Sequence, residues 1–547
     1  MDKPTITRRE WRNVVLFALL VLLLTSLPYL VGVFSQRSDL RFGGFLFGVE
    51  DGNSYLAKMR EGAVDGWLFH IVYTSEPHDG AVLFTPYLAA GKLTAAFVPP
   101  SSPGFVNAML IMFHASRVLF GLLLILLIYR FTAAFISRPA LRGLALLLIC
   151  LGGGFGWLLL LAGQSNWLGS SPVDFILPEG YSFYLFYGLP HLELARAALL
   201  GGLLLTFHAL TLPGLRHWLP WSLGAGLCWL VMGLCVPFYI TVLYVILGVW
   251  GIAALLRTRR FPWQLFLRCV AGCVIPVPYL LYNLIVFATN PVLGAWSGQN
   301  QLASPNPLHY VVGYGLLAAL AIPALRWAWR RGQHHPAYLL LPAWVLAAPV
   351  LAYLPINVQR RLLEGVFVPL CILAVIGFQF LWTGIRARWH LRRPRLIQRE
   401  AAIVLVLLLI PSNLLILATG AAAAAHPATG SILFHSDSEI AALDWLNAHA
   451  VPDSIVLSTL DIGNYLPART SLRAYIGHSP ETIRLEDKLP LVERFLAGTM
   501  SAADRRSLLD AGHIGYVIAQ GSPLDMPELQ EIYHNDDYFL YETKPAN

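Results

Sequence analysis

The sequence predicts a polytopic α-helical membrane protein with about 11 transmembrane helices and a small C-terminal α/β domain outside the bilayer. Composition is the first reason, because 56% of the 547 residues are hydrophobic and only 13% are charged, whereas soluble domains carry about 25% charged residues. The second reason is a series of apolar runs long enough to cross a bilayer. The third is a polar tail with mixed helix and strand patterns. A soluble globular protein is therefore excluded.

Eleven apolar runs reach the roughly 20 residues that a membrane-spanning helix needs. The first run follows Lys3 and three arginines, as a signal peptide would. It is longer than the usual apolar run of about 7 to 15 residues, and no small-residue cleavage site follows, so we expect a retained anchor. The predicted spans are residues 13–34, 105–129, 143–162, 191–211, 219–236, 238–254, 262–287, 309–328, 337–354, 363–384 and 400–420.

The distribution of basic residues sets the orientation. The net charge of +7 comes from residues in loops, so no nucleic-acid partner is expected. The stretch 82–98 is apolar but is broken by Pro86, Gly91 and Lys92. If this stretch does not cross the membrane, the loops on the same side as the N-terminus carry 20 Lys and Arg residues. The short loops on the other side of the membrane then carry 7. The positive-inside rule then places the N-terminus in the cytoplasm and the C-terminus outside the cytoplasmic (inner) membrane.

Three segments are expected outside the bilayer: a long first loop (35–104) with interfacial helices, a second loop (164–190) and the tail (430–547). Residues 1–429 would form the transmembrane module. The six cysteines lie in or beside apolar runs, so neither a disulfide framework nor a Cys-ligated zinc site is expected. The elements predicted in the tail are helices at 437–450, 482–498 and 501–512 and strands at 454–458 and 514–519.

The first loop concentrates acidic residues in a chain that is otherwise poor in charge. In its densest part, Glu50 and Asp51 precede an amphipathic run that contains Tyr55. This predicts a helix on the membrane surface that holds its opening carboxylate at the water–lipid boundary. Asp51 is equally well interpreted as the N-cap of that helix, and Asp51→Asn separates the two roles, because Asn caps about as well but takes no proton. The seven carboxylates of the loop are Asp39, Glu50, Asp51, Glu61, Asp65, Glu76 and Asp79.

The span pattern, the acidic motif soon after the first span and the external α/β tail together resemble the GT-C superfamily of integral-membrane glycosyltransferases. Protein O-mannosyltransferases and bacterial aminoarabinose transferases belong to this superfamily. The similarity in architecture runs over most of the chain. The local motifs that resemble the external loops of these families are Glu50-Asp51-Gly-Asn-Ser-Tyr55, Glu76-Pro-His-Asp-Gly80, Pro178-Glu179 with Pro190-His191, and Gln359-Arg-Arg361.

The resemblance implies a GT-C type fold and a donor sugar carried on a polyprenyl phosphate. The acceptor would be a lipid, glycan or protein of the cell envelope. The acidic residue of the family's first loop would be Asp51 or Glu50, and Asp51 is favoured because it lies at the expected helix start. The order Glu-Asp departs from the Asp-Glu order common in O-mannosyltransferases, so both residues remain candidates for the base.

The chemistry of such a transfer indicates where the donor phosphate binds. Phosphate departs as a stable anion, so one general base and a cationic group are enough. Arg360 and Arg361 are the only basic pair in a short external loop, against the positive-inside bias, and guanidinium groups bind phosphate well. We expect these two arginines to bind the donor phosphate. The alternative is that their side chains extend to the outer lipid headgroups.

Other polar residues of the external loops are candidates for acceptor binding or for a second acid/base pair. His78 with Asp79, and Asp174 with Glu179, suit such roles. Carboxylates are also ligands for divalent ions. A single divalent ion could conceivably be held by Asp51, Asp79 and Glu179. GT-C members that use monophosphate donors resemble metal-independent enzymes, so no metal and no cofactor is predicted. The secondary candidates are His78, Asp79, Glu179, His191 and Tyr55.

Several charged or ionisable side chains fall within spans, where such residues are functional candidates by default. Arg117 lies near the middle of the second span with His114 one turn earlier, and we expect it to pair structurally with another span. Glu193 and Arg196 are spaced i, i+3 and are expected to pair with each other. Arg268 is expected to extend to the cytoplasmic headgroups.

The sequence therefore predicts an inverting glycosyltransferase that uses Asp51 as its base and holds the lipid tail of the donor between spans. A transporter or flippase for lipid or saccharide is the alternative, but transporters usually have paired halves with broken helices, and no such symmetry is visible. A third possibility is a receptor whose tail binds glycan. In that tail, Tyr475-Ile-Gly-His478 resembles external domains of bacterial GT-C-like proteins, which indicates a fold but not a role.

Overall fold

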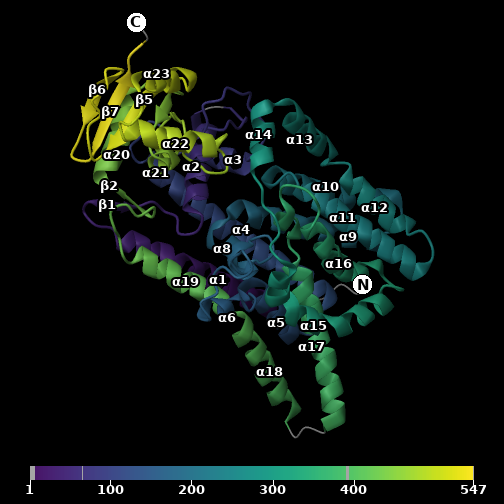
Figure 1. Cartoon of the computed structure of the whole chain (residues 1–547). Helices are drawn as coiled ribbons and strands as arrows, with labels where there is room; N and C mark the ends of the chain where they lie inside the picture. The colour runs from purple at the N-terminus through teal and green to yellow at the C-terminus, as the bar shows by residue number, and fades with distance from the viewer. Residues whose placement is uncertain (1–5, 65, 390–392, 546–547) are drawn as a thin grey trace. The chain divides into compact units, whose positions relative to one another are not determined.

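The computed structural model describes residues 6–64, 66–389 and 393–545 (Figure 1). Its internal contacts divide the chain into two compact units, a helical unit and a mixed unit. The helical unit comprises Met1–Ser26, Ser116–Asn283 and Leu302–Thr419. The mixed unit comprises Leu27–Ala115, Leu284–Gln301 and Gly420–Asn547, so it joins the first loop (35–104) to the tail (430–547).

Within the described residues, seven helices are long and apolar enough to cross a bilayer. Two further pairs bend at a short break, and the number rises to nine if each pair is one span. The pairs are α12 (Trp263–Cys273) with α13 (Val277–Thr289), bent by 54°, and α18 (Pro394–Leu409) with α19 (Pro411–Ala424), bent by 45°. The seven helices are α1 (Arg8–Phe34), α4 (Phe105–Phe135), α9 (Pro190–Thr211), α10 (Leu215–Cys235), α11 (Tyr239–Thr258), α15 (Pro307–Arg331) and α17 (Phe367–Trp389).

The remaining two predicted spans fold as shorter apolar helices. Residues 143–162 form α5 (Pro139–Leu151) and the short α6 (Gly156–Leu161), and residues 337–354 form η1 (Pro336–Leu339) and α16 (Leu340–Ala352). Three consecutive glycines from Gly152 separate α5 from α6. Proline is the first residue of both α18 and α19, a position where its missing N–H costs least. The count of eleven spans therefore stays a prediction.

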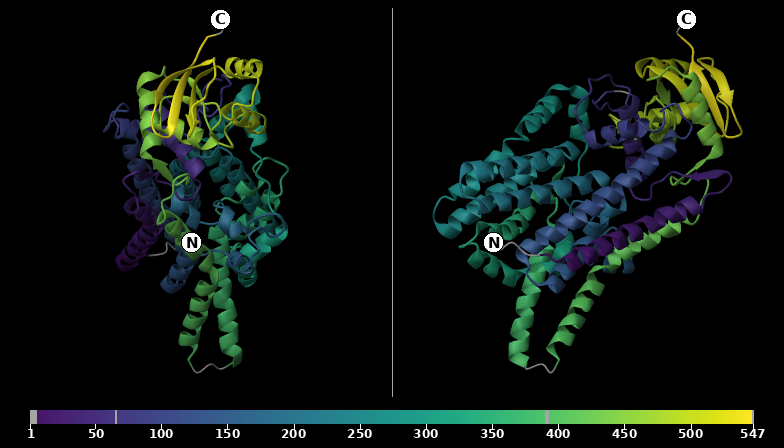
Figure 2. Two further views of the ribbon diagram at one scale, coloured as in Figure 1. Left: turned by 60° about the vertical axis from the view of Figure 1, so that its left-hand side comes forward. Right: turned by 180° about the vertical axis from the view of Figure 1, so that it is seen from behind.

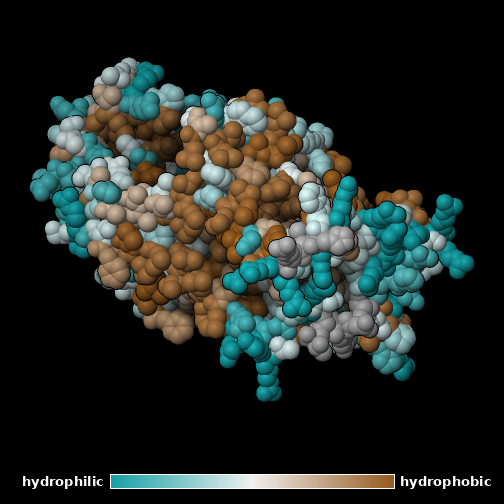
Figure 3. Space-filling view, turned by 90° about the horizontal axis from the view of Figure 1, so that it is seen from below, coloured by the Kyte–Doolittle hydropathy of each residue, from teal (hydrophilic) through white to brown (hydrophobic). Residues whose placement is uncertain are grey.

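Apolar side chains cover much of the surface, as a multi-pass membrane protein requires. Leu16, Leu119 and Ile322 lie exposed on long helices. Figure 3 shows hydrophobic side chains gathered over the face seen from below. In both views of Figure 2, α17 and α18 of the helical unit project together from the other helices. The second loop (164–190) also belongs to this unit and is largely buried, with α7 (Val173–Ile176) and α8 (Phe183–Gly188).

The mixed unit is built around a five-stranded sheet with the strand order β4-β3-β5-β7-β6. Strand β3 runs parallel to β4 and β5, whereas β7 runs antiparallel to β5 and β6. The helices of the tail are α20 (Asp437–His449), α21 (Leu460–Arg469), α22 (Leu485–Leu496) and α23 (Ala502–Ala511). The strands are β3 (Ile455–Leu457), β4 (Arg473–Ala474), β5 (Ile514–Gln520), β6 (Leu529–His534) and β7 (Tyr538–Thr543).

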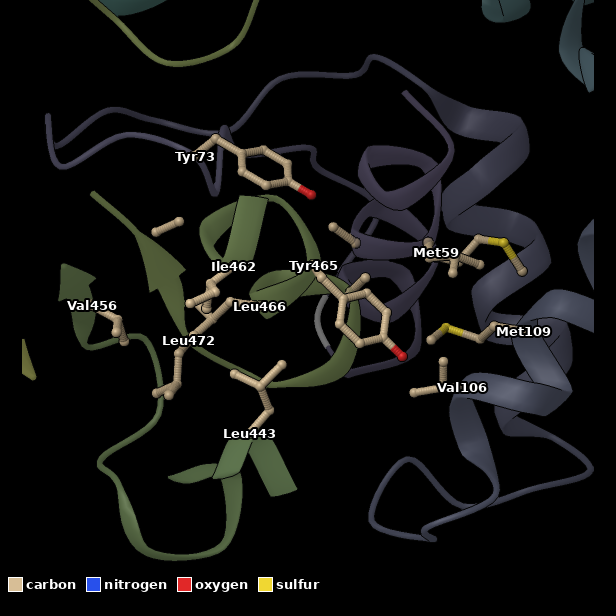
Figure 4. Packing of buried hydrophobic residues seen from close by; sticks show 14 of the residues in the cluster. Met59, Tyr73, Val106, Met109, Leu443, Val456, Ile462, Tyr465, Leu466 and Leu472 are labelled. Carbon is tan, nitrogen blue, oxygen red and sulfur yellow. The ribbon is translucent and has the colours of Figure 1, made fainter. Parts of the chain in front are cut away.

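The two faces of this sheet bury different sets of side chains, because side chains alternate along a strand. In β5, Val517 packs in one cluster with α22 and α23, while Ile518 packs in the other with α20 and α21. That second cluster also contains residues of the first loop. Figure 4 shows Met59 of the first loop in the same cluster as Leu443 and Leu466, together with Met109 from the start of α4. The first loop therefore completes the hydrophobic core of the tail.

Two further features tie the first loop to the tail within the mixed unit. Strand β1 (Leu40–Phe42) pairs antiparallel with β2 (Phe434–Ser436). Helix α2 (Val49–Val64) packs on α21 and on α3 (Thr85–Ala95), and a Cβ added at Gly91 would lie only 1.7 Å from the carbonyl oxygen of Met59. Helix α3 has 11 residues, about 16 Å at 1.5 Å per residue, which is shorter than the hydrocarbon core. Residues 82–98 are not among the candidate spans in the part of the chain that the structure describes.

Candidate active site

Asp51 lies in the first turn of α2, which begins at Val49 after a left-handed Gly48 with φ of +56°. The capping position is therefore Gly48, and the interpretation of Asp51 as the N-cap is wrong. A carboxylate in this turn still benefits from the positive end of the helix dipole. The Asp51 side chain is 51% exposed, so its carboxylate is open to a substrate.

A buried histidine from the tail holds this carboxylate. His478, on the segment between β4 and α22, has only 4% of its side chain exposed, and its Nε2 lies 3.2 Å from Asp51 Oδ1. A Cβ added at Gly477 would lie 2.3 Å from the carbonyl oxygen of Gly463 in α21, so only glycine permits this close approach. In the Nε2–H tautomer, the ring donates a hydrogen bond to Asp51 Oδ1 and fixes the orientation of the carboxylate.

Glu50 is adjacent to Asp51 in the chain but is used differently. Its Oε1 accepts the backbone N–H of Ser479, and its backbone carbonyl accepts from Nδ2 of Asn464 at 3.1 Å. Both partners belong to the tail. Glu50 therefore joins α2 to the tail, while Asp51 presents its carboxylate to the surface.

A buried ion pair lies about two turns further along α2, at Lys58. Lys58 Nζ lies 2.7 Å from Glu481 Oε1, and both side chains are almost fully buried. Ser54 Oγ donates to the same carboxylate at 3.1 Å, and His478 Nδ1 lies 3.7 Å from it. Because a buried charge is costly without a partner, this pairing fixes the position of His478 and Glu481 against α2.

The secondary candidates of the first loop lie in separate surroundings within the mixed unit. Nε2 of His78 accepts the backbone N–H of Ile71 at 2.9 Å, and Nδ1 lies 2.9 Å from the carbonyl oxygen of Glu76. Burial lowers the pKa of His78, which favours the neutral ring. The ring therefore stabilises the loop through its two hydrogen bonds. Asp79 is exposed, and Tyr55 stacks on Tyr87 with ring centroids 4.4 Å apart.

The first loop and the tail are also joined by Glu76 and Lys488, whose Oε2 and Nζ lie 2.8 Å apart. Arg484 Nη2 lies 3.4 Å from the other oxygen of Glu76. Burial disfavours the charged carboxylate, but hydrogen bonds from Lys488 and Thr74 outweigh it and hold the pKa of Glu76 below its ordinary value.

The predicted phosphate-binding arginines belong to the helical unit. Arg361 Nε lies 3.5 Å from Glu179 Oε1; the arginine side chain is 41% exposed and the glutamate 5%. The backbone N–H of Arg360 donates to the carbonyl oxygen of Leu302 at 3.3 Å. The second loop and the loop of the two arginines thus meet at Glu179, which holds Arg361 at the surface. His191 lies in the first turn of α9.

Arg196 does not pair with Glu193, contrary to the i, i+3 expectation. It makes a bidentate ion pair with Glu364, at 2.6 and 2.9 Å, and both side chains are fully buried. The same guanidinium donates to the carbonyl oxygen of Glu179 at 2.7 Å. A long-range carboxylate with bidentate geometry therefore replaces the local partner, and the pair orders the backbone beside Arg361.

The other charged residues of the spans have structural surroundings. Arg117 donates to Ser26 Oγ of α1 at 2.8 Å and to the carbonyl oxygen of Phe186 at 2.7 Å, in agreement with a structural role. Arg268 is buried and donates to the carbonyl oxygens of Ala209 and Leu212 at the end of α9. The expectation that Arg268 extends to the headgroups is wrong, because it satisfies the free carbonyls of a helix end.

His478, Ser479 and Glu481 were missed as partners of the acidic motif. The only sequence signal was the Tyr475-Ile-Gly-His478 motif, which carries no information about a contact 427 residues away. Among residues 6–64, 66–389 and 393–545, no group of three or more His, Cys, Asp or Glu is arranged to hold a metal ion. The carboxylate site belongs to the mixed unit and the arginine site to the helical unit.

Comparison with known proteins supports the class of fold. No family model and no curated sequence matches the chain. Solved structures do match over nearly its whole length, and they are GT-C membrane glycosyltransferases, so the chain has the GT-C type fold. The resemblance seen in the sequence is thereby confirmed at the level of fold.

Three of the matching structures are of an oligosaccharyltransferase from Archaeoglobus fulgidus, AglB. Its apo form aligns with a TM-score of 0.57 at 12% identity, over 94% of this chain and 70% of that one. The form tethered to an acceptor peptide gives 0.54, and the complex with an inhibitory peptide and a dolichol-phosphate gives 0.52. Both are 12% identical and cover 92% of this chain and 69% of the other.

Proposed function

We propose that this protein is a membrane glycosyltransferase. It transfers a sugar from a polyprenyl-phosphate-linked donor to an acceptor on the outer face of the cytoplasmic membrane, with the N-terminus in the cytoplasm and the tail outside. The observation that carries the proposal is the half-exposed Asp51 carboxylate at the start of α2, backed by the buried His478 at 3.2 Å. A carboxylate held in this way is suited to accept a proton.

The proposed reaction is a single inverting displacement. The acceptor oxygen forms a bond to the anomeric carbon as the bond from that carbon to the phosphate oxygen breaks. The acceptor proton passes to Asp51, and the electron pair of the breaking bond leaves with the polyprenyl phosphate. His478 keeps the carboxylate oriented toward the acceptor. Asp51 is favoured over Glu50 because the Glu50 side chain is bonded to the backbone of Ser479.

Arg361 and Arg360 are proposed to bind the donor phosphate. The Arg361 side chain is 41% exposed and is oriented by Glu179. Its guanidinium is therefore placed to donate hydrogen bonds to a phosphate. Glu179 would also limit the affinity for the departing phosphate, because it shares the same cation. The dolichol-phosphate bound by the archaeal neighbour supports a polyprenyl-phosphate donor, and its acceptor peptide supports an acceptor outside the membrane.

The decisive variant is Asp51→Asn, because Asn keeps the shape of Asp but takes no proton. Purified protein is incubated with a panel of prenyl-phosphate sugars, and consumption of the donor is measured. We expect Asp51→Asn to lower turnover by at least about 100-fold, with unchanged donor binding and melting temperature. Glu50→Gln is the matched control, and it should retain turnover. Parental turnover in Asp51→Asn would refute the assignment of the base.

A transporter or flippase is the second candidate, and the bends of 54° and 45° in the two broken helix pairs favour it. The same donor assay separates the two functions. A transporter moves its lipid without chemical change, so detergent-solubilised protein would leave every prenyl-phosphate sugar intact. Consumption of any donor, with release of the prenyl phosphate, excludes transport as the sole activity.

A further inference from the structure

A largely apolar groove of about 720 Å³ lies between α4, α9 and α10 in the helical unit. Its volume falls in the range of about 300 to 1,000 Å³ that small-molecule sites usually occupy. The groove takes no part in the proposed transfer. Its apolar lining includes Leu127, Ala198, Gly201, Leu205, Phe207 and Val231.

One end of the groove is cationic. Arg130 lines it together with His208 and Thr211, and the Arg130 side chain is half-buried. No ion pair of Arg130 is found in the described part of the chain, whereas the neighbouring Arg142 is paired with Glu10 at 2.8 Å. A guanidinium in a membrane helix is costly without an anionic partner. The groove thus provides an apolar channel with an unneutralised cation at one end.

The polar end of the groove lies near the C-terminal ends of α4 and α9 and near the N-terminal end of α10. Arg130 is close to the end of α4 at Phe135, Thr211 is the last residue of α9, and Trp221 lies in the second turn of α10. The proposed topology places these helix ends at the cytoplasmic leaflet. Anionic lipids are concentrated there and are attracted by basic residues near the surface. An anionic headgroup joined to apolar chains matches both parts of the groove.

We propose that this groove binds one anionic phospholipid, with its phosphate at Arg130 and an acyl chain along α9 and α10. The site is distinct from the proposed donor site, because the reaction is assigned to the opposite face of the membrane. The choline of a zwitterionic lipid would place a second cation near Arg130, so the groove discriminates by headgroup charge.

Gly201 allows the acyl-chain part to be tested separately. A Cβ added at Gly201 would have Cys228 Sγ as its nearest neighbour, at 3.8 Å, so a larger side chain can enter the groove without a backbone clash. Gly202 is unsuitable, because a Cβ there would lie 2.2 Å from Nε1 of Trp229. Gly201→Leu should therefore fill the channel while leaving the headgroup end intact.

The full chain is delipidated in detergent and titrated with phosphatidylglycerol or phosphatidylcholine, and bound lipid is counted by native mass spectrometry. We expect the parental protein to bind phosphatidylglycerol more tightly by about fivefold or more, the value for one basic side chain near the surface. Arg130→Gln should remove this preference. Arg138→Gln, at an exposed position beyond the end of α4, is the matched control and should keep it. Gly201→Leu should weaken binding of both lipids.

Equal affinity for the two lipids in the parental protein would overturn the proposal, as would loss of the preference in Arg138→Gln to the same extent as in Arg130→Gln. Unchanged binding in Gly201→Leu would show that the lipid lies elsewhere. Displacement of bound phosphatidylglycerol by an equal concentration of polyprenyl phosphate would reassign the groove to the donor. None of these results depends on whether the protein transfers sugar.

Discussion

At the scale of single residues, the two adjacent carboxylates of the acidic motif have different surroundings. Glu50 accepts a backbone N–H from the tail, and Asp51 is held by a side chain while half of it stays exposed. The helical unit repeats this arrangement with opposite charge, since the buried Glu179 holds the more exposed Arg361. In both places a buried partner orients an open charged group, which reduces the entropy lost when a substrate binds.

The Arg361 site predicts a measurable difference between two variants. Arg361→Gln removes the proposed phosphate partner and should reduce donor turnover by about 100-fold or more. Glu179→Gln removes the competing anion but also the group that orients Arg361. The ratio of its changes in KM and kcat should therefore differ from the ratio in Arg361→Gln. Steady-state kinetics with the consumed donor measures both. If Arg361→Gln retains the parental kcat/KM, Arg361 does not bind the phosphate.

The Glu76 ion pair predicts a pH dependence of stability. The pKa of Glu76 in the folded protein lies below its ordinary value of 4.5, so its contribution is fully present above pH 4.5 and is lost as the pH falls through the folded value. Glu76→Gln leaves Lys488 buried without its counter-ion and should cost about 1 to 3 kcal/mol at neutral pH.

The difference in melting temperature between Glu76→Gln and the parental protein should therefore be largest at neutral pH and shrink below pH 4.5. Thermal melts over a series of pH values measure it. Asp79→Asn in the same loop, with an exposed side chain, is the control and should give a small difference. A difference that grows on acidification would contradict the assigned direction of the shift.

At the scale of elements, the long helices approach closely where glycine replaces a side chain. A Cβ added at Gly377 in α17 would lie 1.7 Å from the carbonyl oxygen of Leu320 in α15. Small residues of this kind let membrane helices pack backbone against backbone. The contact fixes the distance between α15 and α17, and α17 follows directly after the loop that carries Arg360 and Arg361.

Gly377→Ala should therefore force the two helices apart and destabilise the protein by about 1 to 3 kcal/mol, as overpacking does. Gly384→Ala in the same helix is the matched control, because a Cβ there meets nothing within 4 Å. Thermal unfolding of both variants in one detergent compares them directly. Equal melting temperatures would mean that α15 and α17 do not pack this closely.

At the scale of the whole molecule, compact units do not follow the order of the chain. The mixed unit takes Leu27–Ala115, Leu284–Gln301 and Gly420–Asn547 from three distant places. One face of the tail sheet and its helices is covered by α2 and neighbouring residues of the first loop. The tail alone would expose that face to water.

Residues 430–547 expressed alone should therefore aggregate or fail to give a cooperative unfolding transition. Fusing residues 35–115 to the tail through a flexible linker should restore cooperative unfolding, because most of the hydrophobic cluster is then present. Size-exclusion chromatography and thermal melts compare the two forms. A monomeric, cooperatively folded tail would instead favour the division at residue 429 and permit its test as a separate glycan-binding domain.

Much of the fold could be predicted because hydrophobic periodicity is local. The apolar runs and the elements α20, α22, α23 and β5 follow from it, and they are found close to their predicted ranges. Strand β6 was missed because its sequence, Leu-Gln-Glu-Ile-Tyr-His, is polar at a sheet edge. Asp51 could be selected from its motif. Its partner His478 and the Arg196–Glu364 pair could not, since those contacts depend on the tertiary structure.

The separation of 427 residues between Asp51 and His478 has a consequence for biosynthesis. At the usual rate of about 5 to 20 residues per second, the ribosome finishes the histidine roughly 20 to 85 s after the aspartate. During that interval Asp51 has been made but His478 has not. A nascent chain therefore lacks the Asp51–His478 contact until the last fifth of the polypeptide has been made and has packed against the first loop.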